Sequence, residues 1–133
     1  MIRIFKTELI RRQLDPEELK CLEDDFRHYK ANGVLPDLFG RDVPYNHPNT
    51  LPSVKAEELW HIHLLDGEAN WPVHCKKQDD KTSDDHLVYC PAYQTPNCYL
   101  LIAILSPDAH AQARKNQVML DLAKMAENFR VQF

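Results

Sequence analysis

Histidines recur in three stretches of the chain, with a spacing that could serve proton-transfer chemistry. His61 and His63 stand two residues apart in a stretch that alternates like a strand, His86 opens a second such stretch, and His110 follows a third. Histidine has an ordinary pKa of about 6.5, so it can accept or donate a proton close to neutral pH. If the three stretches are neighbours in the fold, they form one histidine-rich site.

The His61-Ile62-His63 run has three interpretations. Residues two apart on a strand project from one face, roughly 6–7 Å apart at the backbone. They could be solvated side chains on the outer face of a half-buried strand, or two metal ligands completed by His86 or His110. They could also be an acid–base pair that works without metal. No carboxylate ligand motif accompanies the pair, which weighs against a metal.

A second basic group follows the histidines near the C-terminus. Arg114 lies four residues after His110, on the same side of a helix if residues 108–114 are helical. Such a pair at the end of an apolar strand is well placed to hold a phosphate, although a solvated first helical turn explains it equally well. Tyr89 alternates with His86, so we expect it on the opposite face, as a core aromatic whose hydroxyl finds a partner.

Length and charge narrow the class of protein. The chain has 133 residues, and we expect one domain with one hydrophobic core over residues 1–133. A formal net charge of −4 and a pI of about 5.9 argue against a globally basic surface that grips free nucleic acid. The acidic stretch 79–85 is interpreted as a solvated loop with no role of its own.

Targeting and redox signals favour a cytoplasmic protein. The N-terminus lacks a signal peptide, and the longest apolar run, Tyr99–Leu105, is far shorter than a membrane span. The four cysteines show no Cys-x-x-Cys pair, so we expect reduced thiols, with Cys21 as a small core residue. Phosphate-binding glycine loops and serine-hydrolase motifs are absent from the sequence.

Hydrophobic periodicity predicts an α+β domain with a largely antiparallel sheet. The strongest signal is a helix over 15–32, because Asp15-Pro16-Glu17-Glu18 can cap its start and Gly33 can end it. The other expected elements are a strand at 2–6, an irregular connection at 34–54, a strand at 56–65, an exposed loop at 66–85, strands at 86–92 and 99–105, a short helix starting at 106–108, and a helix at 117–130.

Several stretches resemble the YafO family of bacterial type II toxins, which are translation-dependent mRNA interferases. The resemblance spans nearly the whole chain and is weakest in 44–58 and 66–84. It is carried by Arg3–Thr7, by Gly33–Asp42, by His61-Ile62-His63-Leu64, by His86-Leu87-Val88-Tyr89-Cys90, by Leu100–Leu105, by Pro107 with His110, Ala113 and Arg114, and by Lys124–Glu127 with Phe129-Arg130.

The resemblance implies a RelE-like toxin fold, in which an N-terminal strand and helices pack on a small antiparallel sheet and a helix ends the chain. In that fold the active site lies on the concave face of the sheet. The two basic positions of one strand correspond to His61 and His63 in this chain, and the basic position before Leu-Val-Tyr in a second strand corresponds to His86. A polar position beyond the last strand corresponds to His110. Histidines at these positions, in place of lysines and arginines, can exchange protons near neutral pH.

The implied activity is metal-independent cleavage of messenger RNA, with no cofactor. His63 or His86 would be the base, His110 the acid, and Arg114 with His61 would stabilise the charged phosphate. The implied partners are a cognate antitoxin, the mRNA and the A site of the ribosome with its large subunit, and no membrane. Two alternatives stay open: a metal-dependent hydrolase built on the His-x-His pair, and a non-catalytic inhibitor that binds the ribosome.

Overall fold

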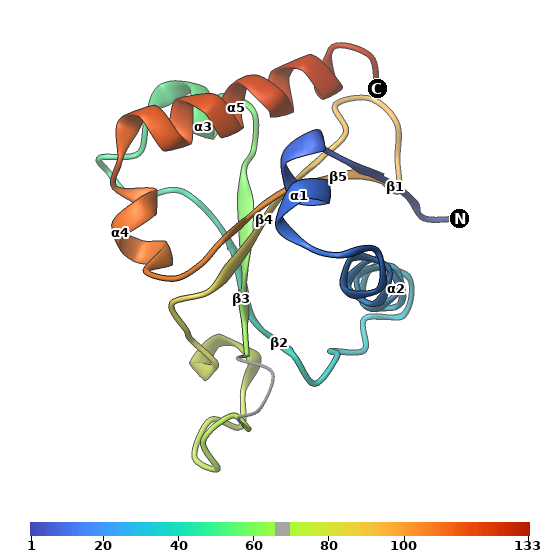
Figure 1. The fold of residues 1–133 in the computed structure, drawn as a ribbon, viewed down its shortest axis with the longest axis vertical. Helices are drawn as coiled ribbons and strands as arrows, with labels where there is room; N and C mark the ends of the chain where they lie inside the picture. Colours follow the sequence, from blue (N-terminus) through green and yellow to red (C-terminus); the bar gives the residue numbers. More distant parts are fainter. Residues whose placement is uncertain (66–69) are drawn as a thin grey trace.

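A five-stranded sheet in the order β1-β5-β4-β3-β2 forms the middle of the molecule (Figure 1). The computed structural model describes residues 1–65 and 70–133. β1 pairs parallel with β5, and the remaining neighbours pair antiparallel, which confirms the α+β class with a mainly antiparallel sheet. The strands are β1 (Arg3–Lys6), β2 (Phe39–Pro44), β3 (Trp60–Leu64), β4 (His86–Pro91) and β5 (Cys98–Leu105).

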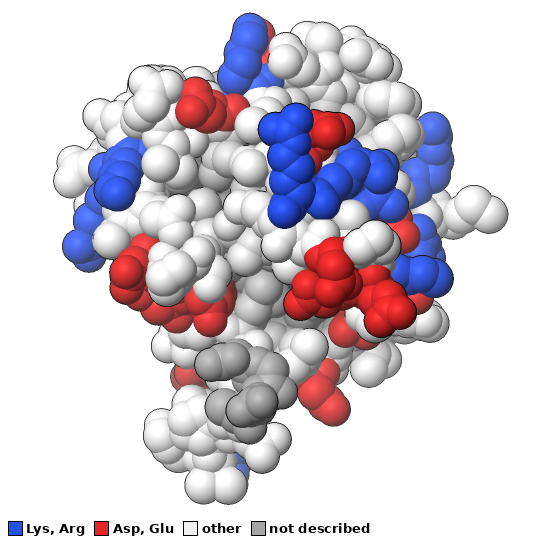
Figure 2. Space-filling model, in the orientation of Figure 1, with Lys and Arg blue, Asp and Glu red and all other residues white. Residues whose placement is uncertain are grey.

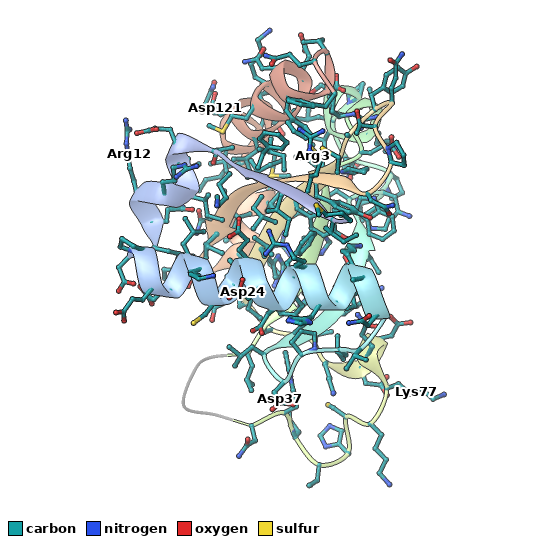
Figure 3. All side chains as sticks on the ribbon, turned by 90° about the vertical axis from the view of Figure 1, so that its right-hand side faces the viewer. Arg3, Arg12, Asp24, Asp37, Lys77 and Asp121 are labelled. Carbon is teal, nitrogen blue, oxygen red and sulfur yellow. The ribbon has the colours of Figure 1, made fainter. Side chains whose placement is uncertain are left out.

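Helices cover both faces of this sheet. α1 (Glu8–Gln13) and α2 (Pro16–Asn32) pack on one face, and Figure 3 shows α2 lying along it with Asp24 on the helix. α3 (Pro52–Ala56), α4 (Ala109–Ala113) and α5 (Asn116–Arg130) belong to the other face. In the described part of the chain, no helix is long and apolar enough to cross a membrane.

Strand alternation divides the apolar interior into two cores. On β4, Leu87 and Tyr89 pack with Phe26 of α2, whereas Val88 and Cys90 belong to the core under α5. β4 is therefore buried almost throughout its length. The Tyr89 hydroxyl donates a hydrogen bond of 2.8 Å to a carboxylate oxygen of Asp42, which confirms it as a core aromatic with a satisfied hydroxyl.

The predicted long helices are confirmed. Asp15 caps α2 by accepting from the Glu18 amide at 2.8 Å, the Glu18 side chain accepts from the Asp15 amide at 3.2 Å, and Gly33 ends the helix at a φ of 70°. α5 begins at Asn116, one residue before its predicted start, and buries Leu122 and Phe129.

The prediction of an irregular connection over 34–54 is wrong, because this stretch contains β2 and the first residues of α3. The prolines in this stretch led to the prediction that it has no regular secondary structure. Pro44 ends β2, an edge strand, and Pro52 begins α3, and neither position needs a backbone N–H. The next strand consequently starts at Trp60 rather than at Ala56, where α3 ends.

Two smaller expectations also change. Cys21 is exposed on α2 and is not a core residue, because it lies two positions from Leu19 and so points away from the buried side of the helix. The predicted loop over 66–85 contains a short 3₁₀ turn, η1 (Gln78–Asp80), and its residues 66–69 lie outside the described residues. All four cysteines are free.

Gly40 joins the 70–85 loop to β2. The Lys81 carbonyl accepts a 2.9 Å hydrogen bond from the Arg41 amide, and the Gln78 side chain donates to the Gly40 carbonyl at 3.0 Å. A Cβ atom at position 40 would lie 2.2 Å from the Lys81 carbonyl oxygen and 2.9 Å from the Trp71 ring. Only glycine lets the loop approach this closely.

We expect Gly40→Ala to lower the free energy of unfolding by about 1–3 kcal/mol, as overpacking commonly does, and to loosen the loop. Chemical denaturation measures the first effect, and the rate of tryptic cleavage in the 76–81 segment measures the second. Gly33→Ala is the matched control, since a Cβ there meets nothing within 4 Å and only the positive φ is strained. Unchanged cleavage of the loop in Gly40→Ala would contradict this role for Gly40.

Candidate functional site

Four histidines converge where β3 ends and β4 begins. The antiparallel register pairs His63 with His86. The ring centroids of these two lie 4.3 Å apart, and that of His61 lies 4.7 Å from His86. His110, in the first turn of α4, lies 4.9 Å from His86 by the same measure. Side chains from three separate stretches of sequence therefore form one cluster.

Alternation along β3 places these rings. Ile62 points into the core beneath α2, so His61 and His63 project from the opposite face. His63 is only 4% exposed and His86 only 1%, whereas the His110 side chain is largely exposed. The interpretation of the His-x-His pair as solvated surface therefore does not fit His63.

A cleft of about 370 Å³ opens over the cluster. His86 lies beneath it, and the Tyr45 ring stacks on His61 with centroids 4.1 Å apart and planes 16° apart. The cleft is lined by His61, His63 and His110 together with Arg41, Val43, Pro44, Tyr45, Asn46, His47, Thr50 and Thr82.

The backbone of Ser83 fixes how two of the rings carry their protons. Its N–H donates to His63 Nδ1 at 2.8 Å, so that nitrogen is unprotonated. Its carbonyl accepts from His86 Nε2 at 3.1 Å, which leaves a lone pair on His86 Nδ1. The carbonyl also lies 3.0 Å from His63 Nδ1, but one nitrogen cannot accept and donate together, and the shorter contact with the amide decides.

Asp84 holds His110 by two contacts. One carboxylate oxygen accepts from the His110 backbone N–H at 2.9 Å and lies 2.6 Å from His110 Nδ1. These hydrogen bonds hold the pKa of the Asp84 carboxyl below its usual range. His110 Nδ1 thus donates to Asp84, and its Nε2 is left for a ligand in the cleft. The interpretation of 79–85 as a solvated loop without a role is incomplete, because Ser83 and Asp84 position three of the histidines.

Burial keeps the inner rings neutral. Loss of solvent, and then the neighbouring histidines, lower the pKa of His61 to about 3. The same two causes, in the same order, lower the pKa of His86 to about 4. Burial also lowers the pKa of His63, against the contact with Ser83 that raises it. Near neutral pH these imidazoles are therefore neutral, and each keeps a lone pair that can accept a hydrogen bond or bind a cation.

The guanidinium at the cleft belongs to Arg41 on β2, whereas Arg114 is exposed at the C-terminal end of α4 and does not line the cleft. The charge of Arg41 contributes to the lowered pKa of His61 and of His63. Sequence reasoning missed Arg41 because the strand that carries it was hidden among prolines. Its place in the family-like stretch Gly33–Asp42 was the available signal.

A buried network behind the sheet anchors the strand that carries Arg41. Asp42 accepts hydrogen bonds from the Tyr29 hydroxyl at 2.7 Å and from the Tyr89 hydroxyl at 2.8 Å, and Lys30 Nζ lies 3.7 Å from it. Burial lowers the pKa of Lys30, against the attraction of Asp42. Because these groups come from α2 and β4, β2 is tied to both, and Arg41 is held at the cleft.

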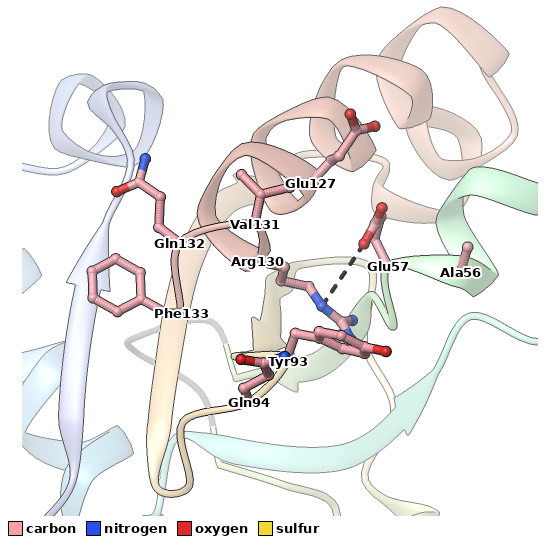
Figure 4. A pocket seen from close by; sticks show the side chains of 9 residues that line it. All are labelled: Ala56, Glu57, Tyr93, Gln94, Glu127, Arg130, Val131, Gln132 and Phe133. Atoms are coloured by element: carbon pink, nitrogen blue, oxygen red, sulfur yellow. Dashed lines mark ion pairs between the residues drawn. The ribbon is translucent and has the colours of Figure 1, made fainter.

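A second cavity, of about 420 Å³, surrounds Arg130 near the C-terminus (Figure 4). Arg130 is 6% exposed, donates to Glu58 at 2.6 Å, and lies 3.8 Å from Glu57. These ion pairs join α5 to the segment between α3 and β3. The Arg130 guanidinium is already paired with two carboxylates, and the residues that line this cavity include no histidine. The smaller cleft, which the histidines line, is therefore the candidate active site.

The face drawn in Figure 2 carries charges of both signs. Clusters of acidic and of basic side chains lie beside one another there, and neither sign covers the face. This agrees with the net charge of −4. A nucleic-acid substrate would therefore need help in reaching the cleft.

Comparison with known proteins agrees with the resemblance seen in the sequence. A family model described as "Toxin YafO, type II toxin-antitoxin system" matches residues 27–131. The mRNA interferase toxin YafO of Escherichia coli (strain K12) is 46% identical over 132 residues, which cover 99% of this chain and 100% of that protein. No solved structure matches the chain. The predicted family is confirmed, and the likeness to the wider RelE-like fold stays a prediction.

The contacts of Ser83 and Asp84 predict a tautomer for each of three rings. With the imidazoles neutral, His63 and His86 are expected as Nε2–H tautomers and His110 as the Nδ1–H tautomer, which long-range ¹H–¹⁵N correlation spectra distinguish. In Asp84→Ala the preference of His110 should be lost, while His63 in the same spectrum serves as the control. An Nε2–H tautomer of His110 in the parent protein would show that Asp84 does not orient it.

Proposed function

This chain belongs to the YafO family of toxins from type II toxin–antitoxin systems, and from that premise we propose that it cuts messenger RNA on the ribosome by metal-independent acid–base chemistry. The name of its E. coli relative, mRNA interferase toxin, supports the class of reaction. The single observation that carries the chemistry is the convergence of His61, His63, His86 and His110 at one cleft.

RNA supplies its own nucleophile for this reaction. A base takes the proton of a ribose 2′-hydroxyl, and the oxygen attacks the neighbouring phosphorus. An acid gives a proton to the departing 5′-oxygen, so that the products end in a 2′,3′-cyclic phosphate and a 5′-hydroxyl. The enzyme must therefore place one ring with a free lone pair and one protonated ring near the same phosphate, and a cation beside the charge that develops on it.

The environments of the rings support a division of these roles. His86 is the favoured base, because its Nδ1 lone pair is free whereas the corresponding lone pair of His63 is taken by the Ser83 amide. His86 is buried beneath the cleft, so it would act through one water molecule. His110 is the favoured acid, since it is the exposed ring at the cleft and the contact of its Nδ1 with Asp84 leaves Nε2 to face the substrate.

We propose that one of the two residues that stabilise the phosphate differs from the sequence-based prediction. His61 lines the cleft and keeps that part of the predicted pair. Arg41, on β2, lines the same cleft, whereas Arg114 is exposed outside it. We therefore assign the guanidinium role to Arg41, which can direct two N–H donors at one phosphate.

The ribosome accounts for the weak electrostatic preference for RNA. A protein with a net charge of −4, and with acidic clusters beside the basic ones on the face drawn in Figure 2, is expected to bind free RNA weakly. A message in the A site is already held in one position by the ribosome. The toxin therefore does not have to supply the free energy needed to orient the RNA. Membership of a type II family adds a cognate antitoxin as partner. The cytoplasm is the compartment where a translated message would be met.

Cleavage is expected only of translated message and should depend on His110. Primer extension on a message with its start codon should reveal cuts that are absent from the same RNA without it. His110→Ala should lower the cleavage rate by about 10²–10⁴-fold, the usual contribution of an acid–base group. His28→Ala, a histidine of α2, is the control expected to cut like the parent.

Three results would contradict this assignment. Equal cutting by His110→Ala and the parent would remove His110 from the reaction. Arrested ribosomes with intact message would favour a non-catalytic inhibitor. Loss of all activity in chelator, with recovery on adding zinc, would favour a metal-dependent hydrolase.

Substitution of Arg41 and of Arg114 tests which of the two arginines stabilises the phosphate. Arg41→Ala is expected to reduce the cleavage rate by about 10²–10³-fold, as loss of one group that stabilises developing charge does. Arg114→Ala, which removes an exposed guanidinium outside the cleft, should stay close to the parent rate. Thermal unfolding of both variants checks that the fold is kept. If Arg114→Ala cleaved more slowly than Arg41→Ala, phosphate stabilisation would be assigned to Arg114 instead.

A further inference from the structure

We propose that His61, His63 and His86 also form a binding site for a transition-metal ion of the zinc type, and that a bound ion inhibits the toxin. Binding of the metal ion does not depend on the proposed RNA-cleavage reaction. The inhibition rests on the proposed function, because it requires that His86 takes a proton and that His61 contacts the phosphate during cleavage.

The geometry of the three rings is close to that of a metal site. One nitrogen from each ring lies within 4.8 Å of the nitrogens of the other two. Three nitrogens bound to tetrahedral zinc at 2.0–2.1 Å lie about 3.3 Å from one another. Small rotations of the side chains would therefore bring them to bonding distance. Two adjacent strands supply all three ligands, so the backbone beneath the site is rigid.

Two of these rings carry a buried nitrogen that needs a ligand. Among the residues that the structure describes, His61 Nδ1 and His86 Nδ1 have no hydrogen-bond partner. Buried polar atoms are nearly always paired, because leaving one unpaired costs its full desolvation free energy. The two nitrogens belong to neighbouring rings whose centroids lie 4.7 Å apart. A single cation between them would satisfy both.

The Ser83 carbonyl supplies the outer contacts that a metal site uses. His86 already donates its Nε2–H to that carbonyl at 3.1 Å, and metal-bound histidines usually donate their second N–H in this way. His63 Nδ1 lies 3.0 Å from the same oxygen. If a proton moved from Nε2 to Nδ1 of His63, the Ser83 amide would lose its acceptor. A small turn of the ring would let Nδ1–H donate to the Ser83 carbonyl instead and would free Nε2 for the metal.

The kind of ion follows from the ligands. The residues that line the cleft include no carboxylate, which disfavours magnesium and calcium. Burial leaves His61 and His86 unprotonated near neutral pH, and neutral imidazoles suit zinc, cobalt, nickel and copper. The fourth position would face the cleft. An ion there would occupy the lone pair of His86 and block the approach of RNA.

Binding is tested on the full chain with Zn²⁺ by calorimetry and with Co²⁺ by absorption. We expect one ion per chain and the intense visible bands of a tetrahedral cobalt centre. His61→Gln, at the half-buried ligand, should weaken binding at least tenfold, whereas His28→Gln should bind like the parent. Tautomer-sensitive NMR of the unsubstituted protein gives a second readout, in which zinc should convert His63 to the Nδ1–H form.

Absence of binding, or equal binding by His61→Gln and the parent, would overturn the metal site. Inhibition is tested separately: Zn²⁺ should stop cleavage of translated message by the parent, and chelator should restore it. Binding without inhibition would overturn the inhibitory role. Activity that needs the metal would overturn both that role and the metal-free reaction, whereas a parent protein that binds no zinc but cleaves message normally would overturn the metal site and leave the proposed function standing.

Discussion

The candidate site depends on the hydrogen bonds made by the backbone N–H and the backbone carbonyl of Ser83. Its N–H and its carbonyl each hold one buried ring, and a single adjustment of protons would turn both rings into donors to the carbonyl. The next residue, Asp84, holds His110. This short segment is itself fixed at both sides, by the pairing of Leu64 with Asp85 and by the close approach of Lys81 to Gly40. A loop without regular structure thus orients side chains from three elements.

The sheet gives the site its electrostatic character. One face of β3 and β4 is apolar beneath α2, and at the end of the other face the histidines take the place of core residues. Burial disfavours their charged forms, so the inner rings stay neutral beside an exposed ring that carries a carboxylate partner. Groups whose environments differ in this way are suited to be base and acid in one reaction. The same neutral rings are what a transition metal binds.

Much of the fold and part of the site could be predicted from the sequence. Helix caps and the alternation of apolar and polar residues are patterns within a short stretch of sequence, so α2 and the two faces of β3 could be predicted. The spacing of the histidines and the family resemblance together identified the four histidines of the site. The tertiary contacts of the site could not be predicted from the sequence. Arg41 lies on a strand concealed by prolines, Asp84 acts through a partner 26 residues away, and Ser83 acts through its backbone, which no side-chain pattern reveals. Arg114 has the predicted helical position but not the predicted place at the cleft.

The central claim is that the ribose of the message, and no metal-bound water, attacks the phosphate. The ends of the RNA produced from translated message in the presence of chelator test it most directly. Attack by the ribose leaves a 2′,3′-cyclic phosphate or 3′-phosphate on the upstream fragment and a 5′-hydroxyl on the downstream fragment. A 3′-hydroxyl with a 5′-phosphate would contradict it.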